Sequence, residues 1–107
     1  MPNLLFICSR NQWRSPTAAS LFRNTDGVKV RSAGTSSKAR KKVSNSDLNW
    51  ADLIFVMEKK HKNQLQAKFS ESLQDKPIHV LGIPDEYRYM DEELIDLLNA
   101  TVTPFLL

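Results

Sequence analysis

Two uninterrupted apolar runs, at residues 4–8 and 53–57, dominate the hydrophobic pattern of the chain. Runs of this length without a polar position are typical of strands that are buried on both faces of a parallel sheet. Residues 28–31 alternate apolar and basic side chains instead, which indicates a half-exposed strand at the edge of the sheet. Residues 78–81 form a short fourth candidate. The pattern therefore predicts four strands, two of them central.

Helix signals lie between these strands. Ser15 precedes Pro16, so a capping hydroxyl followed by a proline in the first turn predicts the start of a first helix. Val43-Ser44 with Asp47-Leu48 has the pattern of an N-cap with a hydrophobic staple, which opens a short second helix toward Trp50. Asp91 begins the last helix, which has acidic residues in its first turn. The third helix is predicted from side chains that recur every four residues on one face: His61, Leu65 and Phe69.

Strands and helices alternate from one end of the chain to the other, with no internal repeat. This alternation predicts an α/β fold, a four-stranded, parallel, open sheet with strand order 2-1-3-4 and helices on both faces. A length of 107 residues corresponds to one domain. We therefore expect residues 1–107 to form a single domain with short connections between its elements.

The composition is that of an ordinary globular protein, with 41% hydrophobic and 25% charged residues. A single cysteine excludes an internal disulfide framework and a multi-thiol zinc site, and the two histidines lie far apart in the sequence. The longest apolar run is too short to span a bilayer, and the first three residues lack the charged start of a signal peptide. We expect a cytoplasmic protein, monomeric or weakly dimeric, with no membrane partner.

The net charge of +3 hides an uneven distribution of charge along the chain. Residues 1–62 carry 12 Lys and Arg against 4 Asp and Glu, whereas residues 63–107 carry 3 against 8. A short basic run occupies residues 38–42. Two interpretations are open on charge alone: the basic half faces an anionic ligand, or it is a solvated basic surface.

The segment at residues 8–16, CSRNQWRSP, joins the first strand to the predicted first helix. Ligands of open parallel sheets bind outside the carboxyl ends of the strands. A loop that leads into a helix N-terminus directs backbone N–H groups and the positive end of the helix dipole at one spot, so it favours an anion such as phosphate. The same field stabilises a thiolate, which makes Cys8 a candidate nucleophile, although a cysteine at the end of a buried strand is more often an inert apolar residue.

Three further side chains of this segment suit a phosphate site. Arg14 lies six residues after Cys8, and its planar guanidinium matches two phosphate oxygens in a way that lysine does not. Ser15 follows it and can donate its hydroxyl to the thiolate. Asn11 is among the few residues besides glycine that tolerate the left-handed conformation such a tight loop requires. Together these residues predict an oxyanion site built around a nucleophilic sulfur.

The residues just described resemble the low-molecular-weight protein tyrosine phosphatase family. Its loop is Cys-x5-Arg-Ser at the end of the first strand, commonly followed by proline, as at residues 8–16 here. Residues 32–35 (SAGT), 39–40 (AR) and 52–58 (DLIFVME) resemble further blocks of the family in the same order, as does an aspartate followed by a tyrosine after the fourth strand. The resemblance therefore covers most of the chain.

The resemblance implies a role for each matching residue of the loop. Cys8 resembles the family's nucleophile and Arg14 its phosphate-binding arginine. Asn11 matches the asparagine that shapes the loop, and Ser15 matches the serine that supports the thiolate. The residues expected to bind the substrate phosphate are Ser9, Arg10, Asn11, Gln12, Trp13, Arg14 and Ser15.

The family's general acid is an aspartate in the loop after the last strand. Asp85 is the best match here, and Tyr87 resembles an aromatic side chain of the cleft wall. A departing aryloxide needs a proton from the side opposite the thiolate, so an acid at this place suits the chemistry. Taken alone, Asp85 after Pro84 also suits a turn, and Glu86 and Asp91 are the alternative acids.

The chain departs from the family pattern at several positions. Arg10 stands where the family has glycine, and Trp13 stands where many members have a second cysteine. Glu86 replaces the proline that usually follows the acid. The segment between Thr35 and Lys38 is much shorter than in the family, which removes a helix and a strand segment that help to wall the cleft.

The resemblance implies a phosphomonoester hydrolase, of the protein tyrosine phosphatase type, that acts through a phosphocysteine intermediate and needs neither metal nor cofactor. Its expected substrates are a phosphorylated protein or a small aryl phosphate, and we expect phosphate or sulfate to bind in the loop. His61 and His79 are interpreted as helix-surface, core-edge or strand side chains without a ligand role.

Three other functions remain as alternatives. Arsenate reduction normally recruits further cysteines, which this chain lacks. A sugar-phosphotransfer carrier has a similar loop without the arginine, so Arg14 argues against it. The non-enzymatic alternative is a weak or inactive module that binds phosphate, a phosphoprotein or, as the least favoured partner, nucleic acid. The basic run and Trp13 or Trp50 would then supply contacts.

Overall fold

Four parallel strands form the centre of the structure, a computed structural model that describes residues 2–106. They lie side by side in the order β2-β1-β3-β4, which confirms the predicted strand order and the α/β class. The two ends of the predicted domain, Met1 and Leu107, lie outside the described residues. The strands are β1 (Asn3–Cys8), β2 (Lys29–Gly34), β3 (Leu53–Val56) and β4 (Ile78–Val80).

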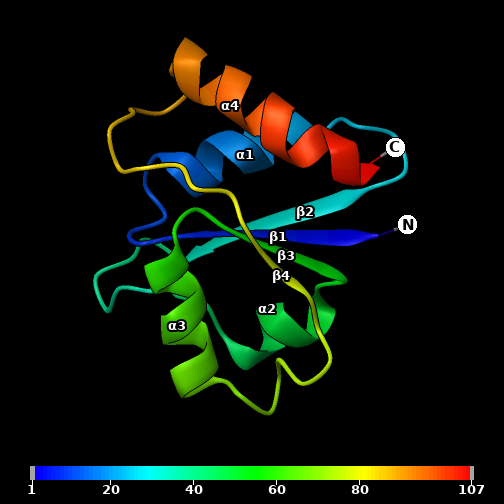
Figure 1. Cartoon of the computed structure of the whole chain (residues 1–107), viewed down its shortest axis with the longest axis vertical. Helices are drawn as coiled ribbons and strands as arrows, with labels where there is room; N and C mark the ends of the chain where they lie inside the picture. Colours follow the sequence, from blue (N-terminus) through cyan, green and yellow to red (C-terminus); the bar gives the residue numbers. More distant parts are fainter. Residues whose placement is uncertain (1, 107) are drawn as a thin grey trace.

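Helices cover both faces of this sheet, as predicted (Figure 1). Helices α1 (Arg14–Phe22) and α4 (Glu92–Val102) lie on one face, and α2 (Asn45–Trp50) and α3 (Lys59–Lys68) lie on the other. A short 3-10 turn, Thr103–Leu106, extends α4. No described helix is both long and apolar enough to cross a membrane.

Successive side chains along β1 point to opposite faces of the sheet, and this alternation divides the core into two halves. Leu4, Phe6 and Cys8 point to the face that α1 and α4 cover, while Leu5 and Ile7 point to the face of α2 and α3. All five side chains are buried, as expected for the first of the two uninterrupted apolar runs. Strand β1 is therefore central and rigid, and its last residue, Cys8, is held at the carboxyl edge of the sheet.

Strand β2 is longer at its carboxyl end than the alternating pattern predicted. It continues to Gly34 because Ser32, Ala33 and Gly34 pair with Phe6, Ile7 and Cys8 of β1. This pairing places Gly34 directly beside Cys8. The extension therefore brings the start of the β2–α2 connection to the edge of the sheet where the first loop begins.

The helix starts agree with the sequence in two cases and differ in one. Ser44 is the N-cap of α2, as predicted, and it forms a capping box with Asp47 that was not predicted. The Asp91 carboxylate accepts a hydrogen bond from the Glu93 N–H at the start of α4. The prediction that Ser15 caps α1 was wrong. Trp13 occupies the N-cap position without a side-chain hydrogen bond, because the Ser15 hydroxyl is engaged with the side chains of the preceding loop.

Candidate active site

The loop between β1 and α1 closes on itself at the carboxyl edge of the sheet. It begins at Cys8, the last residue of β1, and ends at Arg14, the first residue of α1. Asn11 has φ of 53°, the left-handed conformation that the tight loop was predicted to require. The Asn11 amide nitrogen donates to the Ser15 hydroxyl and to the Ser32 hydroxyl, at 2.9 Å each. These bonds fix the loop to both α1 and β2.

The Cys8 sulfur lies beside the Ser15 hydroxyl, which can donate a hydrogen bond to it. Cys8 Sγ and Ser15 Oγ are 3.0 Å apart, and both residues are buried. The alternative acceptor for this hydroxyl, the Ala33 carbonyl oxygen, is farther away at 3.4 Å. Because the Asn11 amide already donates to Ser15 Oγ, the hydroxyl proton is directed to the sulfur when Cys8 is a thiolate. A negative charge on sulfur is thereby stabilised.

The Arg14 guanidinium is buried and anchored through one of its three nitrogens. Nη1 donates to Glu58 Oε1 at 2.5 Å and to the Ile83 carbonyl oxygen at 2.8 Å. These two bonds use both hydrogens of Nη1, so the Nε and Nη2 hydrogens remain for a ligand. Two N–H groups along one edge of a guanidinium match two oxygens of a phosphate. The anchoring therefore presents a fixed anion-binding edge.

Glu58, which sequence analysis placed in a family block but assigned no role, holds this arginine. It lies two residues after the end of β3 and so reaches the same edge of the sheet as Cys8. Partial burial raises the pKa of its carboxyl, but the hydrogen bond and charge of Arg14 outweigh burial, with help from Lys60 and His61, and leave the pKa below its ordinary value. The carboxylate stays ionised at neutral pH and orients Arg14. A carboxylate directly after a buried strand was the sequence signal for it.

His61 was interpreted as a helix-surface or core-edge residue, and the structure places it under the loop, fully buried. Its Nδ1 accepts a hydrogen bond from the Glu58 backbone N–H at 3.1 Å, so the ring proton is on Nε2. Nε2 is 2.8 Å from the Ser9 hydroxyl. Burial, and after it the positive charge of Arg14, lowers the pKa of His61 to about 4. A neutral imidazole therefore supports Ser9 at neutral pH.

The β2–α2 connection packs tightly against the other side of the loop. Three backbone N–H groups of the connection donate to the carbonyl oxygens of Cys8, Ser9 and Arg10, and the donors are those of Thr35, Ser36 and Arg40. Gly34 makes this packing possible, because a Cβ there would lie 2.5 Å from the Ser9 carbonyl oxygen and 2.7 Å from the Ala39 Cβ. The short connection between Thr35 and Lys38 thus becomes a wall of the loop.

Most of the predicted site residues line one small hollow above the loop. Asp85 enters it from the β4–α4 connection, with Oδ1 3.7 Å from Arg14 Nε and a side chain that is 55% exposed. Asn11 and Ser15 lie behind the hollow and shape it. The residues that line it are Cys8, Ser9, Arg10, Gln12, Trp13, Arg14 and Asp85.

The other acidic and aromatic candidates lie apart from the hollow. Asp91 is engaged at the N-terminus of α4, and Glu86 is exposed beside Asp85. Tyr87, expected in the cleft wall, packs against the core beneath α4, and its hydroxyl donates weakly to Glu93 Oε1 at 3.4 Å. Partial loss of hydration and the charges of Glu93 and Glu86 raise the pKa of Tyr87. Asp85 is thus the acidic candidate that faces Arg14.

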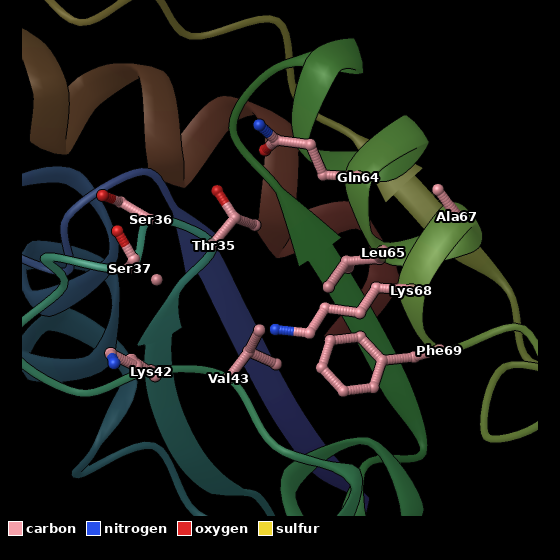
Figure 2. A pocket seen from close by; sticks show the side chains of 11 residues that line it. Thr35, Ser36, Ser37, Lys42, Val43, Gln64, Leu65, Ala67, Lys68 and Phe69 are labelled. Carbon is pink, nitrogen blue, oxygen red and sulfur yellow. The ribbon is translucent and has the colours of Figure 1, made fainter.

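A larger cavity, of about 400 Å³, lies on the other side of the β2–α2 connection (Figure 2). Leu65 and Lys68 of α3, with Phe69 just after the helix, face Thr35 and Val43 across it, and the Lys68 ammonium points inward. Neither Cys8 nor Arg14 lines this cavity. Between residues 2 and 106, no group of three or more His, Cys, Asp or Glu side chains is arranged to hold a metal ion.

The fold is similar to that of several solved phosphatases. SP-PTP, a low molecular weight protein tyrosine phosphatase from Streptococcus pyogenes, is 22% identical with a TM-score of 0.80, and the match covers 99% of this chain and 91% of that one. The tyrosine phosphatase Wzb from Escherichia coli K30, solved in complex with phosphate, is 25% identical with a TM-score of 0.77, over 98% and 96% of the two chains.

A third neighbour acts on a different phosphorylated residue. The YwlE arginine phosphatase from Geobacillus stearothermophilus is 23% identical with a TM-score of 0.75, over 99% of this chain and 94% of that one. The sequence itself matches no family model, and no curated protein is similar to it. At these identities the likeness is one of fold.

Proposed function

We propose that this chain, which has the fold of the low-molecular-weight protein tyrosine phosphatases, is a phosphomonoester hydrolase that works through a phosphocysteine intermediate. One observation carries this proposal. Cys8 Sγ and the free edge of Arg14 line the same hollow at a helix N-terminus, and Ser15 Oγ lies 3.0 Å from the sulfur. A nucleophile and an oxyanion site thus share one small space.

The first step transfers the phosphoryl group to the enzyme. The Cys8 thiolate attacks phosphorus, the S–P bond forms, and the P–O bond to the leaving group breaks. Asp85 gives its proton to the departing oxygen, so the product leaves as a neutral alcohol or phenol. Arg14 and the loop N–H groups supply fixed positive charge to the equatorial oxygens, where kinases use Mg²⁺, so the chemistry needs no metal.

The second step returns the enzyme to its starting state. Water attacks the phosphocysteine, Asp85 accepts a proton from it, and the S–P bond breaks to release inorganic phosphate. The departing thiolate is stabilised by the Ser15 hydroxyl, which makes sulfur an adequate leaving group. Asp85 thus acts as acid and then as base within one turnover.

Bound phosphate also changes the charge around Asp85. In the free site its carboxylate faces the Arg14 guanidinium, with Oδ1 3.7 Å from Nε. A phosphate dianion between Arg14 and the loop neutralises that positive charge and places negative charge beside Asp85. The charge that surrounds Asp85 therefore differs between the free site and the phosphate-bound site.

An aryl phosphate is the substrate class we favour. Trp13 lines the hollow and is 38% exposed, so its ring offers an apolar face to an aromatic leaving group. Phosphate and sulfate are expected to occupy the same hollow as product and inhibitor. A reducing compartment such as the cytoplasm suits this chemistry, because the sulfur must remain a free thiol.

Hydrolysis of p-nitrophenyl phosphate in the presence of EDTA tests the proposal. We expect the wild-type chain to release nitrophenol and vanadate to inhibit it. Cys8→Ser should lose turnover by at least about 10³-fold while still binding phosphate, because Arg14 and the loop are unchanged. Turnover that survives in Cys8→Ser at a wild-type rate would refute the proposal.

A further inference from the structure

The basic run of the sequence, which the proposed chemistry leaves unused, lies beside the hollow. The Arg40 N–H donates to the Arg10 carbonyl oxygen at 3.0 Å, so the β2–α2 connection and the phosphate loop are joined at these two residues. Lys38 lies two residues before Arg40 on the same connection, and all three side chains are exposed. We name Arg10, Lys38 and Arg40 the basic rim.

The basic rim carries charge that no carboxylate neutralises within the described residues. Lys41, its neighbour in sequence, is paired with Asp47, with Nζ 3.0 Å from Oδ1, and Arg31 also contacts that carboxylate. Among residues 2–106, Arg10, Lys38 and Arg40 have no acidic side chain within 4.0 Å. Holding three like charges together costs free energy that an anionic ligand would recover.

The segment that brings Asp85 to the hollow is acidic. Asp85 and Glu86 lie on the β4–α4 connection, and Asp91, Glu92 and Glu93 follow at the start of α4, all of them exposed. The hollow is therefore bordered by Arg10 of the basic rim and by Asp85, and from Asp85 an acidic wall continues away from the hollow to the start of α4. This arrangement is the local form of the charge asymmetry between residues 1–62 and 63–107.

We propose that the basic rim binds acidic residues on one side of the phosphorylated residue of a protein substrate. The inference rests on the proposed function, because it takes the hollow as the place of the phosphoryl group. A polypeptide can carry acidic residues on one side and neutral or basic residues on the other, which suits the two walls. A nucleic acid strand is anionic along its whole length, so the acidic wall would repel the part that crosses it.

Binding of phosphotyrosine peptides to the Cys8→Ser variant tests the inference independently of turnover. Four fluorescent peptides are compared by anisotropy: acidic residues before the phosphotyrosine, after it, on both sides, or on neither. We expect one of the two single-sided peptides to bind about fivefold to tenfold more tightly than the neutral one, from two or three exposed ion pairs. The peptide that is acidic on both sides should bind no better than that one, and the preference should fade in 0.5 M salt.

A matched pair of double variants locates the effect. Lys38→Glu with Arg40→Glu should reduce the preference to about onefold or reverse it. Arg23→Glu with Lys29→Glu makes the same change of net charge at the opposite end of the sheet, and should keep the wild-type preference. Equal binding of all four peptides, or equal loss in both double variants, would overturn the inference.

Two controls separate this inference from other possibilities. If wild type hydrolyses p-nitrophenyl phosphate but the four peptides bind equally, the proposed function stands and the basic rim has no such role. If the wild-type chain is inactive, the proposed function fails. The peptide preference then shows by itself whether the basic rim binds acidic residues. Tighter binding of a single-stranded oligonucleotide than of every peptide at the same ionic strength would assign the rim to nucleic acid and reject the proposal.

Discussion

At the scale of single residues, hydrogen bonds within the protein hold each polar group of the site in one orientation. Ser15 does not cap α1, because its hydroxyl is held between Asn11 and Cys8. Arg14 does not move toward solvent, because Glu58 and the Ile83 carbonyl anchor Nη1. Each anchor fixes one group and leaves another free to face the hollow. This preorganisation is what an oxyanion site requires.

The role of Asp85 predicts a dependence on the leaving group. Asp85→Asn removes the proton donor, so a poor leaving group should suffer far more than a good one. We expect kcat to fall about 100-fold or more with phenyl phosphate and about tenfold or less with p-nitrophenyl phosphate, measured by steady-state kinetics. Glu86→Gln, one residue away and exposed, is the control and should change neither value. Equal losses with both substrates would exclude Asp85 as the acid.

Sequence reasoning identified these residues where the signal was local. Cys8, Asn11, Arg14 and Ser15 lie within eight consecutive positions, so strand, loop and helix start could be recognised together. His61 could not be recognised, because its partner Ser9 is 52 residues away and no local pattern links the two. For Ser15, the predicted contact with the Cys8 sulfur is present, but the predicted capping role was wrong, since a serine before a proline is also the usual pattern of a helix cap.

At the scale of elements, the end of β2 supports the loop as much as α1 does. The predicted strand stopped at residue 31, because Ser32, Ala33 and Gly34 do not continue the apolar and basic alternation. Those residues pair with β1 and place a glycine beside Cys8. The chain needs glycine there for close approach, since a Cβ would lie 3.0 Å from the Asn11 backbone nitrogen as well as near the Ser9 carbonyl oxygen.

Gly34→Ala should therefore distort the phosphate loop. We expect the free energy of unfolding to fall by about 1–3 kcal/mol, from overpacking, and phosphate affinity to fall with it. Urea unfolding and vanadate inhibition measure the two effects. Adding Ala39→Gly removes one of the two closest contacts, at 2.7 Å, and should restore part of the stability but not all, because the Ser9 contact remains. A fully stable and fully active Gly34→Ala chain would contradict this packing.

At the scale of the whole molecule, four chain segments meet at one edge of the sheet. The β1–α1 loop supplies Cys8 and Arg14, the β2–α2 connection supplies two residues of the basic rim, β3 leads to Glu58, and the β4–α4 connection brings Asp85. This convergence follows from a parallel sheet, whose strands all end at the same edge. Which strands are central and which lies at an edge was predictable from hydrophobic patterns. The side-chain contacts between segments were not, because they depend on the packing of distant residues.

The buried His61 makes the stability of the fold sensitive to acid. Its pKa is about 4 in the folded chain and near 6.5 when exposed, so on acidification the unfolded chain takes up a proton first. Stability is therefore present above pH 6.5 and falls toward pH 4, by about 2–3 kcal/mol from this group. Protonation would also place a donor against the Glu58 N–H and a charge near Arg14.

Unfolding of wild type and His61→Gln in urea between pH 7 and pH 4 measures this contribution. The difference in stability between the two chains should shrink or reverse as the pH falls, because glutamine has no proton to take up. His79→Gln, which replaces the histidine that packs on Phe105, is the matched control for the loss of an imidazole. A constant difference between wild type and His61→Gln across this range would mean that His61 is not held neutral.

The central claim is that Cys8 carries the phosphoryl group during turnover. Rapid acid quench of wild type with p-nitrophenyl phosphate, followed by mass spectrometry of the peptide that contains residue 8, tests it most directly. We expect one phosphoryl group bound to the Cys8 sulfur, accumulating further in Asp85→Asn as water attack slows. Nitrophenol release with no phosphoryl group on Cys8 in either chain would contradict the mechanism.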